Sequence, residues 1–323
     1  MTSAVEVVAS AEERELAMRD DVRAGLSARP RSVPPVWFYD ETGSRLFDEI
    51  TRLPEYYLTR AERAILAERS AEIAALSGAS TLVEIGSGTS EKTRILLDAM
   101  ASSGRLRSVV LLDISEEVLC EAAAELSRRY GVEVQAVVGD LRTDLPALSG
   151  RGEGERLWAF LGSTIGNFEP KARADVFAGF RRALQPGDTF LLGADLVKDV
   201  GRLLAAYDDA RGVTAEFNLN VLRVLNSALG ADFRPEGFAH RVSWNSEERW
   251  VEMRLRSKAE QTVRIASLGL DLDFADGEDI LTEISAKFDP AKLAAELADA
   301  GFAPAGSWTD PDGDFLLTLS RPA

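Results

Sequence analysis

The chain has 323 residues, of which 46% are hydrophobic and 28% are charged, so it can bury one large core or two smaller ones. Its formal net charge of −16 at pH 7 argues against nucleic acid as a partner, because binding a polyanion requires clustered lysine and arginine. No segment approaches the roughly 20 apolar residues that span a bilayer, and residues 1–21 do not resemble a signal peptide, which predicts a cytoplasmic protein without a membrane partner.

Cysteine and histidine each occur once, at Cys120 and His240. A lone cysteine forms no intrachain disulfide, and Cys120 lies in the helix-like stretch EEVLCEAAAEL, where a small core residue is the favoured interpretation. His240 lies in the alternating, strand-like stretch FAHRVSW and offers no metal-ligand spacing. The sequence therefore predicts neither a metal site nor catalysis by cysteine and histidine.

From residue 81 onward, short aliphatic runs alternate with helix-like patterns, which is typical of a parallel sheet with crossover helices. The best marked helix follows Glu169, because Pro170 suits a first helical position and Pro186-Gly187 ends the pattern. The fold class that we predict is α/β, with helices on both faces of the sheet. The expected strands, continuous enough to be buried on both faces, are 81–86, 108–115, 132–140, 157–163 and 188–197.

The pattern changes after these strands. Residues 199–235 are helix-like, and from about 238 to 275 a period of two takes over, with Val251, Met253 and Leu255 on one strand face. This predicts a β-rich insertion or second domain.

The end of the chain is expected to return to the first sheet. Residues 281–288 and 313–320 are predicted to add two strands to it, with a helix from Asp289-Pro290 to Gly301 between them. We expect residues 1–60 to pack with the insertion.

The stretch LVEIGSGTSEKT contains two glycines, Gly86 and Gly88, that permit a tight turn and close approach of the backbone to a ligand. The free N–H groups of the following helix favour an anion there. A dinucleotide site would have a third glycine where this chain has Glu91, so an NAD-dependent oxidoreductase is the second choice.

Acidic residues around this loop favour S-adenosylmethionine instead. Glu84 precedes the first glycine, Asp113 ends the second strand, and Asp140 ends the third. Asp113 can accept both ribose hydroxyls, and Asp140 can accept from the adenine amine. Each residue alone is more often structural, but their order at the ends of successive strands predicts a cofactor site.

The fourth strand bears on the substrate. Many methyltransferases that modify amino groups of nucleic acids carry an Asn/Asp-Pro-Pro-aromatic element here, whereas this chain has FLGSTIGNFEP. Asn167 could offer its amide to a zwitterion, although as an isolated residue it is more often a loop turn residue.

Five long segments carry a resemblance to a known family. They are PPVWFYDETGSRLFDEITRLPEYYLTRAE (34–62), LVEIGSGTSEKTRILLDAM (82–100), FLGSTIGNF (160–168), LLGADLVKDVGRLLAAYDDARGVTAEFN (191–218) and LTEISAKF (281–288). These segments closely resemble the L-histidine Nα-methyltransferases of ergothioneine biosynthesis. The resemblance implies a Rossmann-like class I methyltransferase that converts histidine to hercynine with three molecules of S-adenosylmethionine. It implies a cofactor domain of residues 61–198 and 286–323, and a substrate domain of residues 1–60 and 199–285.

The resemblance also implies site residues. Those for the cofactor are Gly86, Ser87, Lys92, Asp113, Asp140 and Leu141. Those for the substrate are Tyr56, Asn167, Tyr207, Met253, Glu283 and Ser285. Within this set Asn167 and Tyr207 would hold the carboxylate, Glu283 and Ser285 the imidazole, and Met253 would be a pocket wall. Tyr39 and Tyr56 would assist at the reacting amine.

One part of this assignment also follows from the residues themselves. In an extended strand, Glu283 and Ser285 are two positions apart and point to the same face, where both could meet one imidazole ring.

The remaining alternatives are a methyltransferase for another free aromatic amino acid and a non-catalytic ligand-binding protein. A monomer is expected.

Overall fold

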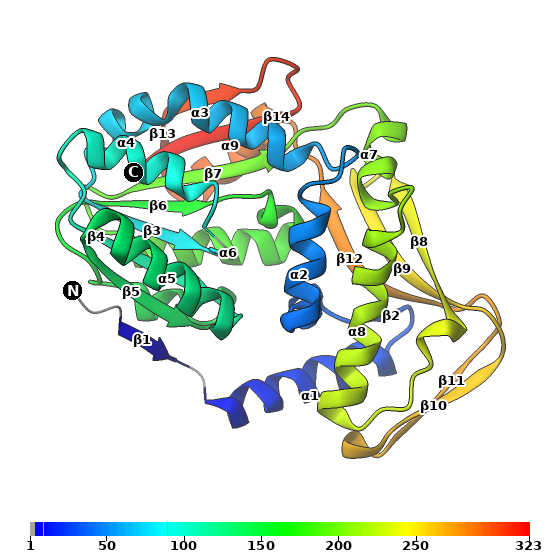
Figure 1. Ribbon diagram of the computed structural model, residues 1–323. Helices are drawn as coiled ribbons and strands as arrows, with labels where there is room; N and C mark the ends of the chain where they lie inside the picture. Colours follow the sequence, from blue (N-terminus) through cyan, green and yellow to red (C-terminus); the bar gives the residue numbers. More distant parts are fainter. Residues whose placement is uncertain (1–3, 9, 89) are drawn as a thin grey trace. The chain divides into compact units, whose positions relative to one another are not determined.

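The computed structural model describes residues 4–8, 10–88 and 90–323 (Figure 1). It divides into two compact units. The first contains the described residues up to Val8, together with Leu58–Val197 and Lys287–Ala323. The second contains residues 10–57, together with Lys198–Ala286. Among the helices of the described ranges, none is long and apolar enough to cross a membrane.

The first unit is built on an eight-stranded sheet with the order β1-β5-β4-β3-β6-β7-β14-β13. All neighbours from β1 to β7 are parallel, and β14 and β13 are added in antiparallel fashion. The five strands expected between residues 81 and 197 are present. The bounds are β1 (Ala4–Val7), β3 (Thr81–Ile85), β4 (Ser108–Asp113), β5 (Glu133–Val138), β6 (Arg156–Phe160), β7 (Thr189–Asp195), β13 (Phe302–Thr309) and β14 (Phe315–Pro322).

The helices of this unit cover both faces of the sheet (Figure 1). The crossovers from β3 to β5 step in one direction along the sheet and the crossover from β6 to β7 steps in the other. Because such crossovers are right-handed, α4 and α5 lie on one face and α6 on the opposite face. The bounds are α3 (Leu58–Ser77), α4 (Thr93–Ser102), α5 (Glu116–Tyr130), α6 (Pro170–Ala183) and α9 (Pro290–Asp299).

Burial of apolar side chains in the core accounts for the strands of this sheet and for helix α6. Every residue of β3, β6 and β7 is buried, as the continuous aliphatic runs predict. Helix α6 begins with Pro170 at its first position and buries Phe177 and Phe180, and the Phe180 ring packs 4.6 Å from that of Phe190 in β7, centroid to centroid. The order of strands reverses between β3 and β6, which is the switch point where open α/β sheets bind ligands.

Two sequence expectations about this sheet are wrong. Residues 281–286 do not join it, because their strand, β12 (Asp279–Ala286), pairs with β9 in the second unit, and the second added strand is β13. Of the expected strand, Phe288 forms a bridge to this side, with Leu196 after β7. Residues 4–7, which we placed with the insertion, form β1 and pair with β5. Four residues at a sheet edge carry too little periodicity to reveal that pairing. Residues 1–3 and 9 of the same expectation lie outside the described residues.

The second unit has a four-stranded sheet with the order β2-β12-β9-β8 and a separate hairpin of β10 and β11. Both of its chain segments contribute helices. Val251, Met253 and Leu255 are buried on one face of β9, as their alternation predicts. The bounds are α1 (Ala11–Ser27), β2 (Arg31–Ser32), α2 (Glu41–Ile50), α7 (Val200–Tyr207), α8 (Val213–Leu229), β8 (Phe238–Asn245), β9 (Trp250–Ser257), β10 (Gln261–Ile265) and β11 (Leu270–Phe274).

Candidate active site

The glycine-containing loop leaves the end of β3 at the switch point. Gly86 and Gly88 have φ of +70° and +48°, a conformation that favours glycine. The backbone carbonyl of Leu112 accepts the N–H groups of Gly86 at 2.8 Å and Ser87 at 3.2 Å. The loop is thereby held against the end of the neighbouring strand β4.

Asp113 is the last residue of β4, and its side chain also binds the glycine-containing loop. Its Oδ2 accepts the N–H of Gly88 at 2.7 Å, and its Oδ1 accepts the N–H of Ser115 at 3.0 Å. Burial raises the pKa of the Asp113 carboxyl, and the N–H groups of Ser115, Gly88 and Ile114 lower it. Asp113 is thus set by backbone contacts at the carboxyl edge of the sheet.

Asp140 lies beside Asp113, because the N–H of Gly139 donates to the Asp113 carbonyl at 3.0 Å. The Asp140 carboxylate accepts the Arg142 N–H at 2.8 Å and forms an ion pair with the Arg142 guanidinium at 2.7 Å. Leu141, half-buried, follows it. The loop after β5 therefore presents a half-buried carboxylate whose orientation is fixed by its own sequence neighbours.

Lys92 immediately precedes α4 and forms an ion pair with Glu62 of α3. Glu62 is fully buried, and its Oε1 accepts the N–H of Gly162, after β6, at 2.8 Å. Through Glu62, Lys92 is therefore linked to the loop that follows β6.

The residues of this edge fit an adenosyl cofactor. A Cβ added at Gly86 or Gly88 would meet no atom of the described residues within 4 Å, apart from the glycine's own chain neighbours, so the turn is open on that side. Ser87 Oγ is buried without a hydrogen-bond partner among the described residues. An orphaned buried hydroxyl in a loop that is bonded to Asp113 suits a polar ligand with ribose and amine donors.

Glu84, in β3 just before the loop, is buried and accepts hydrogen bonds from Ser90 Oγ at 2.9 Å and from Thr93 Oγ1. Burial raises the pKa of Glu84 to about 7, while the hydroxyls of Thr93 and Ser90 and the charge of Lys92 lower it. Glu84, the acidic residue before the first glycine, thus stabilises the loop through hydrogen bonds within the protein.

In the second unit, the hydroxyls of Tyr207 and Ser285 form a buried hydrogen bond of 2.7 Å. His240 supports this pair, since its Nε2–H donates to the Tyr207 carbonyl at 2.9 Å and its Nδ1 accepts from the Asn218 amide at 2.8 Å. Burial lowers the pKa of His240, which favours this neutral form. The lone histidine of the chain therefore orients Tyr207.

A bulge in β12 determines which side chains share a face with Ser285. Leu281 pairs with Arg254 and Glu283 with Met253, so Thr282 is an extra residue, and its hydroxyl donates to the Met253 carbonyl at 3.0 Å. Beyond the bulge, Glu283 lies opposite Met253 on the face that carries Ser285. Glu283, Ser285 and Met253 are thus brought together.

Tyr39 and Tyr56 belong to a cluster of aromatic rings in the same unit. The Tyr56 ring packs edge-on against Tyr207 at 6.2 Å and against Phe47 at 6.3 Å, between ring centroids. Tyr39 packs edge-on against Phe47 at 5.8 Å and Phe217 at 5.6 Å. The cluster joins the segment around residues 39–56 to α7 and α8.

Residues 18–322 match the family described as histidine-specific methyltransferases, SAM-dependent. The chain belongs to this family. It is 55% identical over 305 residues to the histidine N-alpha-methyltransferase of Mycolicibacterium smegmatis, which covers 94% of each chain. It is 53% identical over 306 residues to that of Mycobacterium tuberculosis, covering 94% of this chain and 95% of the relative. The ergothioneine biosynthesis protein 1 of Neurospora crassa is 35% identical over 212 residues, which are 64% of this chain and 24% of the relative.

Membership of this family confirms two predictions from the sequence. The protein is a methyltransferase that uses S-adenosylmethionine, on a Rossmann-like α/β sheet. The oxidoreductase and the non-catalytic alternatives are rejected.

The predicted site residues of this methyltransferase fall into two groups. Those for the cofactor all lie in the first unit around the carboxyl ends of β3, β4 and β5. Asn167 lies in the same unit, half-buried at the end of the 3-10 turn η3 (Thr164–Asn167) after β6. The others lie in the second unit. Sequence reasoning missed Glu62, Phe47, Phe217 and His240, whose patterns resemble ordinary helix or strand positions.

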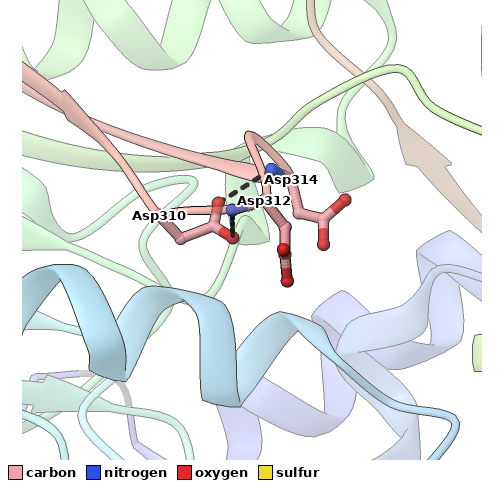
Figure 2. Close-up of side chains that lie close together, drawn as sticks. All are labelled: Asp310, Asp312 and Asp314. Carbon is pink, nitrogen blue, oxygen red and sulfur yellow. Dashed lines mark hydrogen bonds between the residues drawn. The ribbon is translucent and has the colours of Figure 1, made fainter.

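The methyltransferase also has an acidic turn between β13 and β14 (Figure 2). Asp310, Asp312 and Asp314 bring carboxylate oxygens within 4.8 Å of one another. Asp310 Oδ1 accepts the N–H groups of Asp314 at 2.8 Å and Phe315 at 2.7 Å, and its Oδ2 accepts that of Asp312 at 3.2 Å. These bonds build the turn, and the expectation that the enzyme needs no metal stays a prediction.

Proposed function

We propose that this methyltransferase transfers three methyl groups to the α-amine of L-histidine and so produces hercynine for ergothioneine biosynthesis. The observation that carries the proposal is the 55% identity, over 94% of both chains, to a protein named histidine N-alpha-methyltransferase. The similarity to an ergothioneine biosynthesis protein supports the pathway. The residues assigned to the cofactor belong to the first unit, and those assigned to the amino acid, apart from Asn167, belong to the second.

S-adenosylmethionine supplies an electrophilic methyl group on its sulfonium. Asp113 would accept the ribose hydroxyls and Asp140 would accept from the adenine amine, and both carboxylates are already oriented by backbone N–H groups. Ser87 offers its hydroxyl, which has no hydrogen-bond partner among the described residues, and Lys92 and Leu141 complete the contacts. Because these groups are fixed before binding, little ordering is required when the cofactor binds.

On the second unit, Glu283 accepts an imidazole N–H, and Ser285 contacts the same ring. Their common face with Met253 supports this assignment, because a carboxylate and a hydroxyl then lie beside an apolar wall. Tyr207 is assigned to the substrate carboxylate. The part of Asn167 in binding that carboxylate stays a prediction.

The reaction requires a neutral amine lone pair aligned behind the methyl carbon, so the residues act chiefly by positioning. A free α-amine has a pKa of roughly 8, and Tyr39 and Tyr56 are assigned to hydrogen bonds that help to remove its proton. The aromatic faces of the cluster around Phe47 suit the growing ammonium, which becomes permanently cationic after the third transfer.

The test is mass spectrometry of the products formed from a panel of free amino acids with S-adenosylmethionine. Histidine should gain up to three methyl groups, while tryptophan, tyrosine and phenylalanine should remain unmodified. Asp113→Ala serves as the control that lacks cofactor binding. Methylation of another aromatic amino acid in preference to histidine would replace the proposed substrate. The cytoplasmic location and the monomeric state stay predictions.

A further inference from the structure

Glu62 is a buried carboxylate to which neither the sequence nor the proposed mechanism gives a role. It lies in the second turn of α3, and its side chain is fully buried in the first unit. An unpaired charge in such a place is strongly unfavourable, so its contacts account for its presence.

The two oxygens of Glu62 contact both sides of the switch point. Oε2 pairs with the Lys92 ammonium, at the end of the glycine-containing loop after β3. Oε1 accepts the N–H of Gly162, in the loop after β6, at 2.8 Å. These two loops flank the position where the order of strands reverses. Glu62 therefore joins them from a third element, α3.

The surrounding backbone leaves room for this carboxylate. A Cβ added to Gly193 of β7 would collide with Glu62 Oε1, so the absence of a side chain there allows the approach. Gly162 has a φ of +77°, and a Cβ on it would lie 3.4 Å from Lys92 Nζ. Two glycines and one lysine thus surround a single acidic group.

We propose that Glu62 is a positioning residue for methyl transfer, which fixes Lys92 for the cofactor and the Gly162 loop for the substrate. The second part follows because that loop leads into the η3 turn that ends at Asn167. The inference rests on the proposed roles of Lys92 and Asn167.

Three variants separate the two contacts. Glu62→Gln keeps an oxygen for the Gly162 N–H but removes the charge that pairs with Lys92. Lys92→Met removes the same pair from the other side. Glu62→Ala removes both contacts. The readouts are the Kd of S-adenosylhomocysteine by calorimetry, the KM for histidine, and the melting temperature.

Glu62→Gln and Lys92→Met should each weaken S-adenosylhomocysteine by about tenfold or more, as expected for a charged hydrogen bond. The double variant should lose less than the product of the two single losses, because both remove one interaction. Glu62→Ala should in addition raise the KM for histidine above that of Glu62→Gln. Unchanged Kd in Glu62→Gln, or multiplicative losses in the double variant, would overturn the proposal.

Asp188→Asn is the matched control for a general loss of stability. Asp188 pairs with Arg156 at 2.6 Å, both are buried in the same unit, and they lie at the beginnings of β7 and β6, on the opposite edge of the sheet. This variant should lower the melting temperature without changing the Kd. An equal loss of affinity in Asp188→Asn would refute a positioning role for Glu62. If the cofactor results hold but histidine is not methylated, the proposed substrate is wrong and the Glu62–Lys92 coupling stands.

Discussion

The hydroxyls of Tyr207 and Ser285, 2.7 Å apart, join helix α7 to strand β12. A hydroxyl donates one hydrogen bond and accepts up to two, so this pair is compatible with a further contact of each hydroxyl to a substrate. This hydrogen bond links Tyr207, which is assigned to the substrate carboxylate, with Ser285, which is assigned to the imidazole.

Tyr207→Phe should therefore raise the KM for histidine by about tenfold, as expected for a lost hydrogen bond that leaves a buried group without its partner. The Kd of S-adenosylhomocysteine should not change, because Tyr207 is not among the cofactor residues. Steady-state kinetics with histidine and histidinamide check this. If the variant discriminates between histidine and histidinamide as strongly as the unmodified enzyme does, Tyr207 does not bind the substrate carboxylate.

Asp113→Ala should reduce the affinity for S-adenosylhomocysteine by about 1.5–3 kcal/mol, since charged hydrogen bonds to ribose hydroxyls are lost. Isothermal titration calorimetry measures the change. Asp98→Ala is the control, because Asp98 is an exposed acid on α4 that pairs with Arg129. Equal affinities of the Asp113 variant and the unmodified protein would remove Asp113 from the cofactor site.

Glu84 should make the free energy of unfolding depend on pH. Its pKa is raised from 4.5 to about 7, so between these values the folded state binds a proton that the unfolded state does not. Its contribution is fully present below pH 4.5 and is lost as the pH rises through 7. Relative to Glu84→Gln, the unmodified protein should lose on the order of 3 kcal/mol over this interval. Urea unfolding of both proteins at several pH values tests this, and parallel curves would contradict it.

His240 gives the opposite dependence. Burial lowers its pKa below 6.5, so as the pH falls through 6.5 the unfolded chain binds a proton that the folded chain does not, and stability decreases. The chain has one histidine, so NMR without substrate reports its ring directly. We expect a titration midpoint below 6.5 and a proton on Nε2 in the neutral form. A midpoint above 6.5 would show that the ring is not held by Tyr207 and Asn218 as described.

The sequence was sufficient to place the predicted cofactor residues at one edge of the sheet, because the signals for that placement are local. Gly86, Asp113 and Asp140 follow buried parallel strands in order, and the carboxyl ends of such strands meet at one edge. The partner of β12 was not predictable, since its aliphatic run suits either sheet and antiparallel pairing with β9 depends on contacts distant in sequence.

Other features of the site depend on geometry that periodicity does not contain. The extra residue Thr282 shifts the alternation of β12, so the faces of residues before and after it are not related by a period of two. Glu62 resembles a solvated helix charge until the positions of Lys92 and Gly193 are known. Such residues are found from packing and not from patterns.

Glu283 should select the imidazole ring, because a half-buried carboxylate opposite Met253 can accept a hydrogen bond from a ring N–H. Glu283→Gln keeps the shape but removes the charge, so it should weaken histidine binding by about 1.5–3 kcal/mol. Glu283→Ala should do more: by opening space beside Met253, it should reduce discrimination against larger apolar rings, which a hydrophobic pocket rejects only weakly.

The measurement is kcat/KM for histidine, tryptophan and phenylalanine in the unmodified enzyme and both Glu283 variants. Glu252→Gln is the control, because Glu252 lies on the neighbouring strand β9 opposite Ile284, and its carboxylate pairs with Arg254. Adjacent residues of a strand point to opposite faces, so Glu252 is directed away from the face of Met253 and Glu283. This control should retain the preference for histidine. If Glu283→Ala retains it too, the imidazole is recognised by other residues, and Glu283 is not the group that determines specificity.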